Sequence, residues 1–175
     1  MTLFSYLNTI SRQRLPWLLL FAFVVFFEGC ALFFQHVLGL APCVMCIYER
    51  IAMLGIGGAA LIGAIAPNNR VFRWVGLLLW GGCTYKGVRL ALEHVNLQFH
   101  PSPFTTCDRF VTLPSWLPLN DWMPWMFKAY GDCGDIVWQF LSLSMPQWLV
   151  IIFIGNLVAF ALLITSQCVK PLRSM

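Results

Sequence analysis

The sequence predicts an all-α membrane protein: a bundle of four transmembrane helices with two loops on its outer side, the second long and carrying a short interfacial helix. Of the 175 residues, 59% are hydrophobic and 10% are charged, and the mean hydropathy is +0.76. Soluble domains are about 45–50% apolar and about 25% charged. The apolar residues gather in four runs, each long enough to cross a bilayer as a helix. The length suits a single domain over residues 1–175.

The four expected spans lie at about residues 15–34, 46–66, 71–92 and 147–167. Residues 1–14 form a short polar lead, and the first run is too long for the core of a signal peptide, so we expect it to be retained. The outer loops are expected at about 35–45 and 93–146. Basic residues flank the runs, at Arg12 and Arg14, at Arg70 and Arg73, and at Lys170 and Arg173. By the positive-inside rule this places both termini in the cytoplasm.

Two features inside the spans are polar or unusually small. Glu28 lies near the middle of the first run, where an unpaired charge is costly, so we expect it to be protonated or hydrogen-bonded between helices. In the second run, Gly55, Ala59 and Gly63 recur at a spacing of four. This stripe indicates either close approach of a neighbouring helix or small residues that any membrane helix tolerates.

The long outer loop contains three tryptophans among prolines, Trp116, Trp122 and Trp125. Tryptophan is enriched where membrane meets water, so we expect a short helix or turn on the outer leaflet with these rings dipping into it. The alternative is that the rings pack onto the helix bundle. The loop is rich in acids and shows no interleaved basic and aromatic stretch of the kind that binds nucleic acid. We therefore expect no nucleic-acid partner.

The motif that carries chemistry is Pro42-Cys43-Val44-Met45-Cys46-Ile47-Tyr48-Glu49-Arg50, directly before an apolar run. Residues three and four apart share a helix face, so Cys43, Cys46 and Arg50 can lie together. The start of a helix favours an anion such as a thiolate. This spacing is typical of a redox pair, here at the membrane edge.

Of the seven cysteines, four lie at the expected outer surface: Cys43, Cys46, Cys107 and Cys133. Three pairings of four cysteines are possible, and the local pair Cys43–Cys46 leaves Cys107–Cys133. Two structural staples are one alternative. Another is a zinc site with help from His36, His94 or His100, but zinc sites usually have two CxxC units, so we expect no metal. Cys30, Cys83 and Cys168 are expected to be free.

Further motifs occur in order along the whole chain: Phe34 to Val37, Glu93-His94, Pro101 to Phe104, Cys107-Asp108, Gly131 to Cys133, and Met145 to Trp148. Together with the CxxC motif, they closely resemble the DsbB family of bacterial inner-membrane disulfide bond formation proteins. The resemblance implies a four-helix membrane enzyme that reoxidises DsbA, a periplasmic thioredoxin-fold oxidase, and passes the electrons to a membrane quinone, ubiquinone or menaquinone.

The resemblance also implies roles for particular residues. Cys107–Cys133 reacts with reduced DsbA through Cys107, and Cys43–Cys46 reoxidises that pair. Cys46 then delivers the electrons to the quinone, with Arg50, His94 and Met145 beside it. On the sequence alone, Arg50 could instead pair with Glu49, and His94 could be a solvated interfacial histidine.

Two rival functions remain at this point. A reductase resembling vitamin K epoxide reductase also combines a CxxC with a quinone-like ligand in a four-helix bundle, but the motifs outside the CxxC favour the DsbB family. A non-enzymatic four-span scaffold with stapled outer loops would differ in its thiol chemistry, because staples resist mild reductant whereas a redox relay equilibrates with a dithiol.

Overall fold

A computed structural model describes residues 3–100 and 111–169 of the chain. The elements are α1 (Leu3–Ser11), α2 (Arg14–His36), α3 (Val44–Ile65), α4 (Arg70–Phe99), α5 (Leu119–Trp122), α6 (Pro124–Phe127), β1 (Gln139–Phe140), β2 (Leu143–Ser144) and α7 (Met145–Ser166). The two short strands pair antiparallel as a small hairpin. The chain is therefore almost entirely helical outside its loops, as the sequence predicted.

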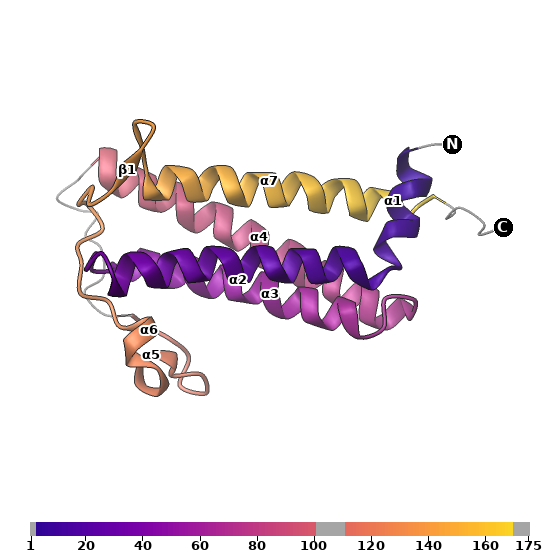
Figure 1. Cartoon of the computed structure of the whole chain (residues 1–175), viewed down its shortest axis with the longest axis horizontal. Helices are drawn as coiled ribbons and strands as arrows, with labels where there is room; N and C mark the ends of the chain where they lie inside the picture. Colours follow the sequence, from indigo (N-terminus) through magenta and orange to yellow (C-terminus); the bar gives the residue numbers. More distant parts are fainter. Residues whose placement is uncertain (1–2, 101–110, 170–175) are drawn as a thin grey trace.

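Four long helices, α2, α3, α4 and α7, run alongside one another and form the body of the molecule (Figure 1). α3 and α4 pack against each other at the centre, α2 packs on α3, and α7 packs on α4. The short helices α5 and α6 lie at one end of the bundle, and both ends of the chain lie at the other. The molecule thus has two different ends separated by a long helical body.

Within the described ranges, three helices are long and apolar enough to cross a membrane: α2, α3 and α7. They match three of the four expected spans to within two residues at each end. α4 covers the remaining expected span, 71–92, but is a longer and less apolar helix that carries several charged residues. The structure confirms a helical membrane protein with three candidate spans.

Close packing between α3 and α4 depends on small residues. A Cβ added to Gly76 of α4 would lie 3.1 Å from the carbonyl oxygen of Ala59 and 3.1 Å from Cα of Gly63. A Cβ on Gly55 would lie 2.5 Å from Sγ of Cys83 on α4. Of the two interpretations of the small-residue stripe, the structure supports close helix approach.

Much of the polar lead expected over residues 1–14 forms a helix, α1, which the sequence analysis did not predict. Asn8 of α1 is 2% exposed, and its Nδ2 donates to the carbonyl oxygens of Ser166 and Val169 at 3.1 and 2.6 Å. Ser166 is the last residue of α7 and Val169 lies just after the helix, where backbone acceptors lack helical partners. Asn8 is thus buried because it caps the last long helix.

The tryptophan-rich loop forms two short helices, α5 and α6, rather than one. Trp116, Trp122 and Trp125 are 74%, 61% and 54% exposed. Most of each ring is therefore uncovered, although the Trp125 ring also packs beside that of His36 at the end of α2, with ring centroids 6.1 Å apart. These exposed fractions leave a set of indole rings on the surface at the end of the molecule where α5 and α6 lie.

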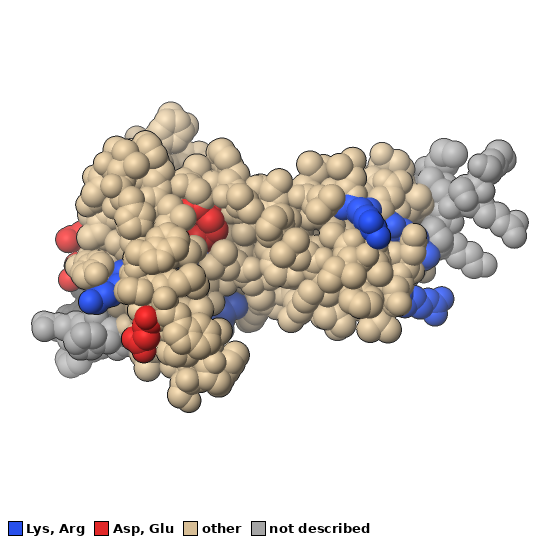
Figure 2. Space-filling model, turned by 60° about the horizontal axis from the view of Figure 1, so that its bottom comes forward, with Lys and Arg blue, Asp and Glu red and all other residues tan. Residues whose placement is uncertain are grey.

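The acidic residues seen in Figure 2 lie toward one end of the molecule. They lie at the end that carries α5 and α6, where some Lys or Arg also appear, whereas Lys and Arg without acids gather toward the end where the termini lie. The surface between is mainly uncharged. An uncharged band between charged ends is the surface expected of a protein embedded in a bilayer.

Candidate active site

The CxxC motif forms the first turn of α3. Cys43 is the N-cap residue, with extended backbone angles (φ −86°, ψ 173°), and its Sγ accepts a hydrogen bond from the backbone N–H of Cys46 at 3.3 Å. A sulfur atom thus occupies the position usually taken by a capping oxygen. Cys43 is 3% exposed, whereas Cys46 is half-buried. Both are free cysteines, and their Sγ atoms lie 2.9 Å apart.

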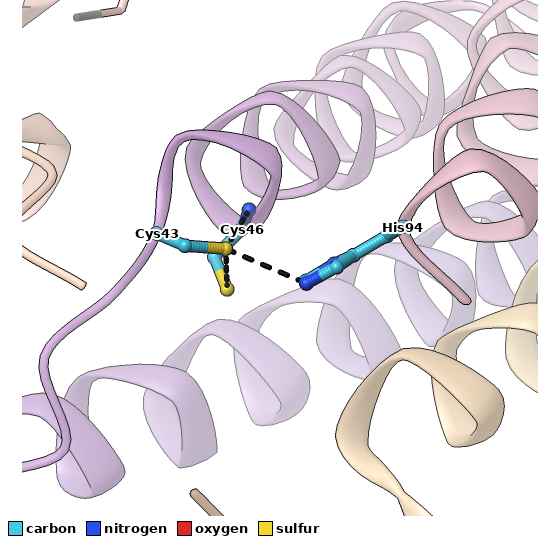
Figure 3. A group of neighbouring side chains, drawn as sticks. All are labelled: Cys43, Cys46 and His94. Atoms are coloured by element: carbon cyan, nitrogen blue, oxygen red, sulfur yellow. Dashed lines mark hydrogen bonds between the residues drawn. The ribbon is translucent and has the colours of Figure 1, made fainter. Parts of the chain in front are cut away.

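His94 approaches this pair from α4 (Figure 3). Its Nε2 lies 3.5 Å from Sγ of Cys43, and its Nδ1 lies 3.1 Å from Oε1 of Glu49 on α3. His94 is 3% exposed and Glu49 is 2% exposed. The interpretation of His94 as a solvated interfacial residue was therefore wrong. The carboxylate of Glu49 holds one ring nitrogen, and this orients the other toward sulfur.

Arg50 points from α3 toward α2. Its Nε lies 3.4 Å from Oε2 of Glu28, and its Nη1 donates to Oε1 of Gln35 at 2.9 Å and to the carbonyl oxygen of Met126. Arg50 is only 7% exposed. The alternative partner Glu49 was wrong, because that carboxylate binds His94. Glu28 contacts another helix, as its position near mid-span predicted.

Sequence reasoning considered Glu49 only as a partner of Arg50 and did not consider Gln35 or Met126, although two signals were present. Gln35 follows Glu28 by two helical turns, so both face the same neighbour. Glu49 follows Cys46 by three residues and therefore shares its helix face. The contact of Met126 uses a backbone carbonyl, which no side-chain pattern reveals.

The second outer loop docks on the first through its backbone. The N–H groups of Tyr130 and Gly131 both donate to the carbonyl oxygen of Pro42, at 2.9 and 3.0 Å. Gly131 has no space for a side chain, since an added Cβ would lie 2.5 Å from the carbonyl oxygen of Ala41. This contact holds the chain just before Cys133 against the chain just before Cys43.

Cys133 is fully buried and disulfide-bonded, and it belongs to the same buried cluster as Cys43 and Met45. Its expected partner, Cys107, lies outside the described residues. Two segments of the chain that each carry a candidate redox cysteine thus meet at one end of the bundle.

The remaining predicted residues lie elsewhere or take no part in this cluster. Met145 is the first residue of α7, is half-buried and is not a member of the buried cluster around Cys43. Cys30, Cys83 and Cys168 are free, as expected. The described site therefore consists of the cysteine pair, His94, Glu49, and Arg50 with its partners on α2 and α6.

An apolar helical bundle with paired cysteines at one end defines a membrane protein of thiol–disulfide exchange. The chain matches the family model for the disulfide bond formation protein DsbB over residues 13–163. It is similar to disulfide bond formation protein B of Vibrio parahaemolyticus, with 68% identity over 95% of this chain and 94% of that protein. The protein of the same name from Vibrio cholerae is 65% identical over 99% of this chain and 100% of its own length. That from Aeromonas hydrophila is 54% identical over 95% and 96%.

The chain belongs to the DsbB family. It is accordingly an oxidoreductase of the thiol-oxidase type that works in disulfide bond formation. The prediction drawn from the scattered motifs is confirmed at the level of family and enzyme class.

Proposed function

We propose that this protein spans the bacterial inner membrane four times, with both termini in the cytoplasm and the cysteine pairs facing the periplasm. α4 would be the fourth span. Its position between α3 and α7 supports this, because both neighbours are candidate spans. The gathering of basic residues at the end with the termini supports the orientation.

The proposed reaction transfers two electrons from a DsbA-like thioredoxin-fold dithiol to membrane ubiquinone or menaquinone. DsbA is known as a strong oxidant with a potential of about −120 mV, whereas structural disulfides lie below about −300 mV. For a two-electron transfer, a difference in potential of 30 mV corresponds to about 1.4 kcal/mol. Oxidation of DsbA by an ordinary disulfide would therefore be unfavourable by roughly 8 kcal/mol. Quinone supplies the missing driving force by accepting the two electrons and two protons as it becomes quinol.

The first steps use thiol–disulfide exchange alone. A thiolate of the partner attacks Cys107 of the Cys107–Cys133 disulfide, forms a mixed disulfide and releases Cys133 as a thiolate. The second partner thiolate then breaks the mixed disulfide and leaves as the oxidised partner. That step frees Cys107 as a thiolate. Cys133 attacks Cys43 of the oxidised CxxC pair, forms a Cys133–Cys43 disulfide and releases Cys46 as a thiolate. Cys107 then attacks Cys133, which re-forms the Cys107–Cys133 disulfide and releases Cys43, so that the CxxC pair is left reduced. The shared buried cluster of Cys133 and Cys43 is the observation that carries this route.

The residues beside Cys46 suit a quinone head group. Arg50 is buried, and its Nε makes no hydrogen bond beyond the longer ion-pair contact with Glu28. A guanidinium in a water-poor site stabilises negative charge on the Cys46 sulfur or on a ring oxygen. His94 adds an imidazole that Glu49 already orients. We assign quinone binding to Cys46, Arg50 and His94, and to Met145 on the strength of the family resemblance alone.

The decisive experiment mixes the purified protein in lipid nanodiscs with quinone and a reduced thioredoxin-fold partner, and follows the loss of quinone absorbance. Cys46→Ala should abolish turnover, and Cys107→Ala should abolish the mixed disulfide with the partner. Cys83→Ser is the matched control, because Cys83 lies on α4 away from the pair and should leave turnover intact. Undiminished quinone reduction by Cys46→Ala would contradict the proposal.

A further inference from the structure

Three atoms that bind soft metal ions converge in the reduced site: Sγ of Cys43, Sγ of Cys46 and Nε2 of His94 (Figure 3). All three lie within 4.8 Å of one another. Two residues come from the first turn of α3 and the third from α4. We propose that the dithiol form of this site binds a zinc-class divalent cation through Cys43, Cys46 and His94, and that the bound ion blocks reoxidation of the pair.

The spacing of the atoms fits tetrahedral zinc after one small movement. Zn–S bonds of about 2.3 Å and Zn–N bonds of about 2.05 Å imply S···N edges of about 3.6 Å and S···S edges of about 3.8 Å. The Cys43 Sγ to His94 Nε2 distance is already 3.5 Å. The sulfur pair, at 2.9 Å, must open by roughly 0.9 Å to reach the tetrahedral edge. Rotation of the half-buried Cys46 side chain supplies this movement.

The partner of His94 is the second observation that points to a metal. Metal-bound histidines almost always donate their other ring N–H to a carboxylate or carbonyl, which fixes the ring and leaves the free nitrogen as ligand. Glu49 makes this contact at Nδ1, while Nε2 faces the sulfur atoms. Glu49 is 2% exposed, so water does not compete strongly for it.

Three protein ligands leave a fourth position for water, as in open zinc sites with two cysteines and one histidine. Binding requires no electron transfer: two thiols lose two protons, and the two thiolates bind one cation. The disulfide form has no thiolates to offer and should not bind. Metal-held sulfurs cannot form the sulfur–sulfur bond, so the ion would trap the enzyme in its reduced state. Binding itself is independent of the proposed function, whereas inhibition of turnover rests on it.

Cobalt is the probe, because thiolate-bound Co²⁺ in tetrahedral geometry absorbs strongly in the near ultraviolet and visible. The full chain in nanodiscs, with Cys30, Cys83 and Cys168 replaced by Ser, is reduced, freed of reductant under argon and titrated with Co²⁺. We expect a chelator-reversible thiolate–cobalt band, its displacement by Zn²⁺, release of about two protons, and no band from the quinone-oxidised chain.

Variants decide which residues hold the ion. Glu49→Gln should weaken binding about 10–100-fold, and His94→Gln should weaken it at least as much. The control is His36→Gln, an exposed histidine at the end of α2, which should bind as the parent does. Absence of the band in the reduced chain would overturn the proposal, and so would an equal band after Cys43→Ser with Cys46→Ser, or equal affinity in His94→Gln.

The same preparations separate this inference from the proposed function. Quinone reduction by metal-free protein tests the function alone, and the cobalt spectrum tests the metal site alone. Zn²⁺ should stop quinone reduction in the parent and do so at higher concentration in Glu49→Gln. Binding without any inhibition would refute the blocking step.

Discussion

The contact between Gly131 and Ala41 sets the distance between the two outer loops, and Gly131→Ala tests its importance. The new Cβ would lie 2.5 Å from the carbonyl oxygen of Ala41, whereas non-bonded heavy atoms pack at about 3.5 Å. Because the obstacle is backbone, no rotamer change relieves it, and the loops must separate by about 1 Å. That separation also weakens the two hydrogen bonds to Pro42, worth about 0.5–1.5 kcal/mol each.

A misplacement of about 1 Å can slow a reaction about 100-fold. We expect Gly131→Ala to reduce quinone reduction by a reduced thioredoxin-fold partner roughly 10–100-fold. The mixed disulfide with the partner should still form and should accumulate, because the slowed step is the exchange from Cys133 to Cys43. The assay combines quinone absorbance with non-reducing gels of acid-quenched samples.

Gly134→Ala is the matched control three residues along the chain. Its added Cβ would meet only Oδ1 of Asp132, at 3.4 Å, an ordinary contact. This variant should turn over at close to the parent rate. If Gly131→Ala also stays within twofold of the parent, the loop contact does not govern exchange between the two cysteine pairs, and that reasoning fails.

Three further predictions concern other parts of the structure. Glu28→Ala leaves Arg50 buried without its ionic partner, so thermal unfolding should show a loss of stability of about 3–5 kcal/mol, and quinone reduction should slow. Glu28→Gln should recover part of the stability and part of the rate. A Glu28→Ala variant as stable as the parent would contradict the pairing of Glu28 with Arg50. Asn8→Ala removes two hydrogen bonds to the backbone at and just after the end of α7. It should lower the free energy of unfolding by about 1–3 kcal/mol and leave the turnover rate unchanged. As a control, Asn68→Ala, at an exposed position, should keep the free energy of unfolding within about 0.5 kcal/mol of that of the parent. Trp122→Ala should reduce the quenching of protein fluorescence by brominated lipids without shifting the unfolding midpoint; unaltered quenching would place this ring outside the bilayer.

The sequence predicted the long helices well because the thickness of the bilayer fixes the length of an apolar run. It predicted their ends less well. Hydropathy placed the end of the third span at 92, but α4 continues to Phe99. Helical hydrogen bonding does not stop at a charged residue, and Ala91 and His94 are buried in this last part of α4. The helix therefore continues past the point at which its composition becomes polar.

The first helix was missed for a related reason. Asn8 and Ser11 resemble solvent-exposed residues when read alone, yet both are 2% exposed. The Asn8 side chain donates to backbone carbonyls more than 150 positions away, at and just after the end of α7. No local pattern reports a contact with so distant a segment.

The active site shows the same division. The CxxC motif and Arg50 stand together in the sequence and were found from spacing. The link from Cys43 through His94 to Glu49 joins two helices, so it became visible only in the fold. The side chain of Arg50 points toward α2 because Glu28 of that helix places a carboxylate beside it, which only the packing of the helices reveals.

The capping of α7 by α1 has a consequence for biosynthesis. The ribosome makes α1 long before α7, so α1 must wait, undocked, until α7 has been made. Docking of α1 is thus a late event that joins two segments far apart in the sequence. A bulky fusion at the N-terminus would interfere with that final docking far more than with insertion of the earlier spans.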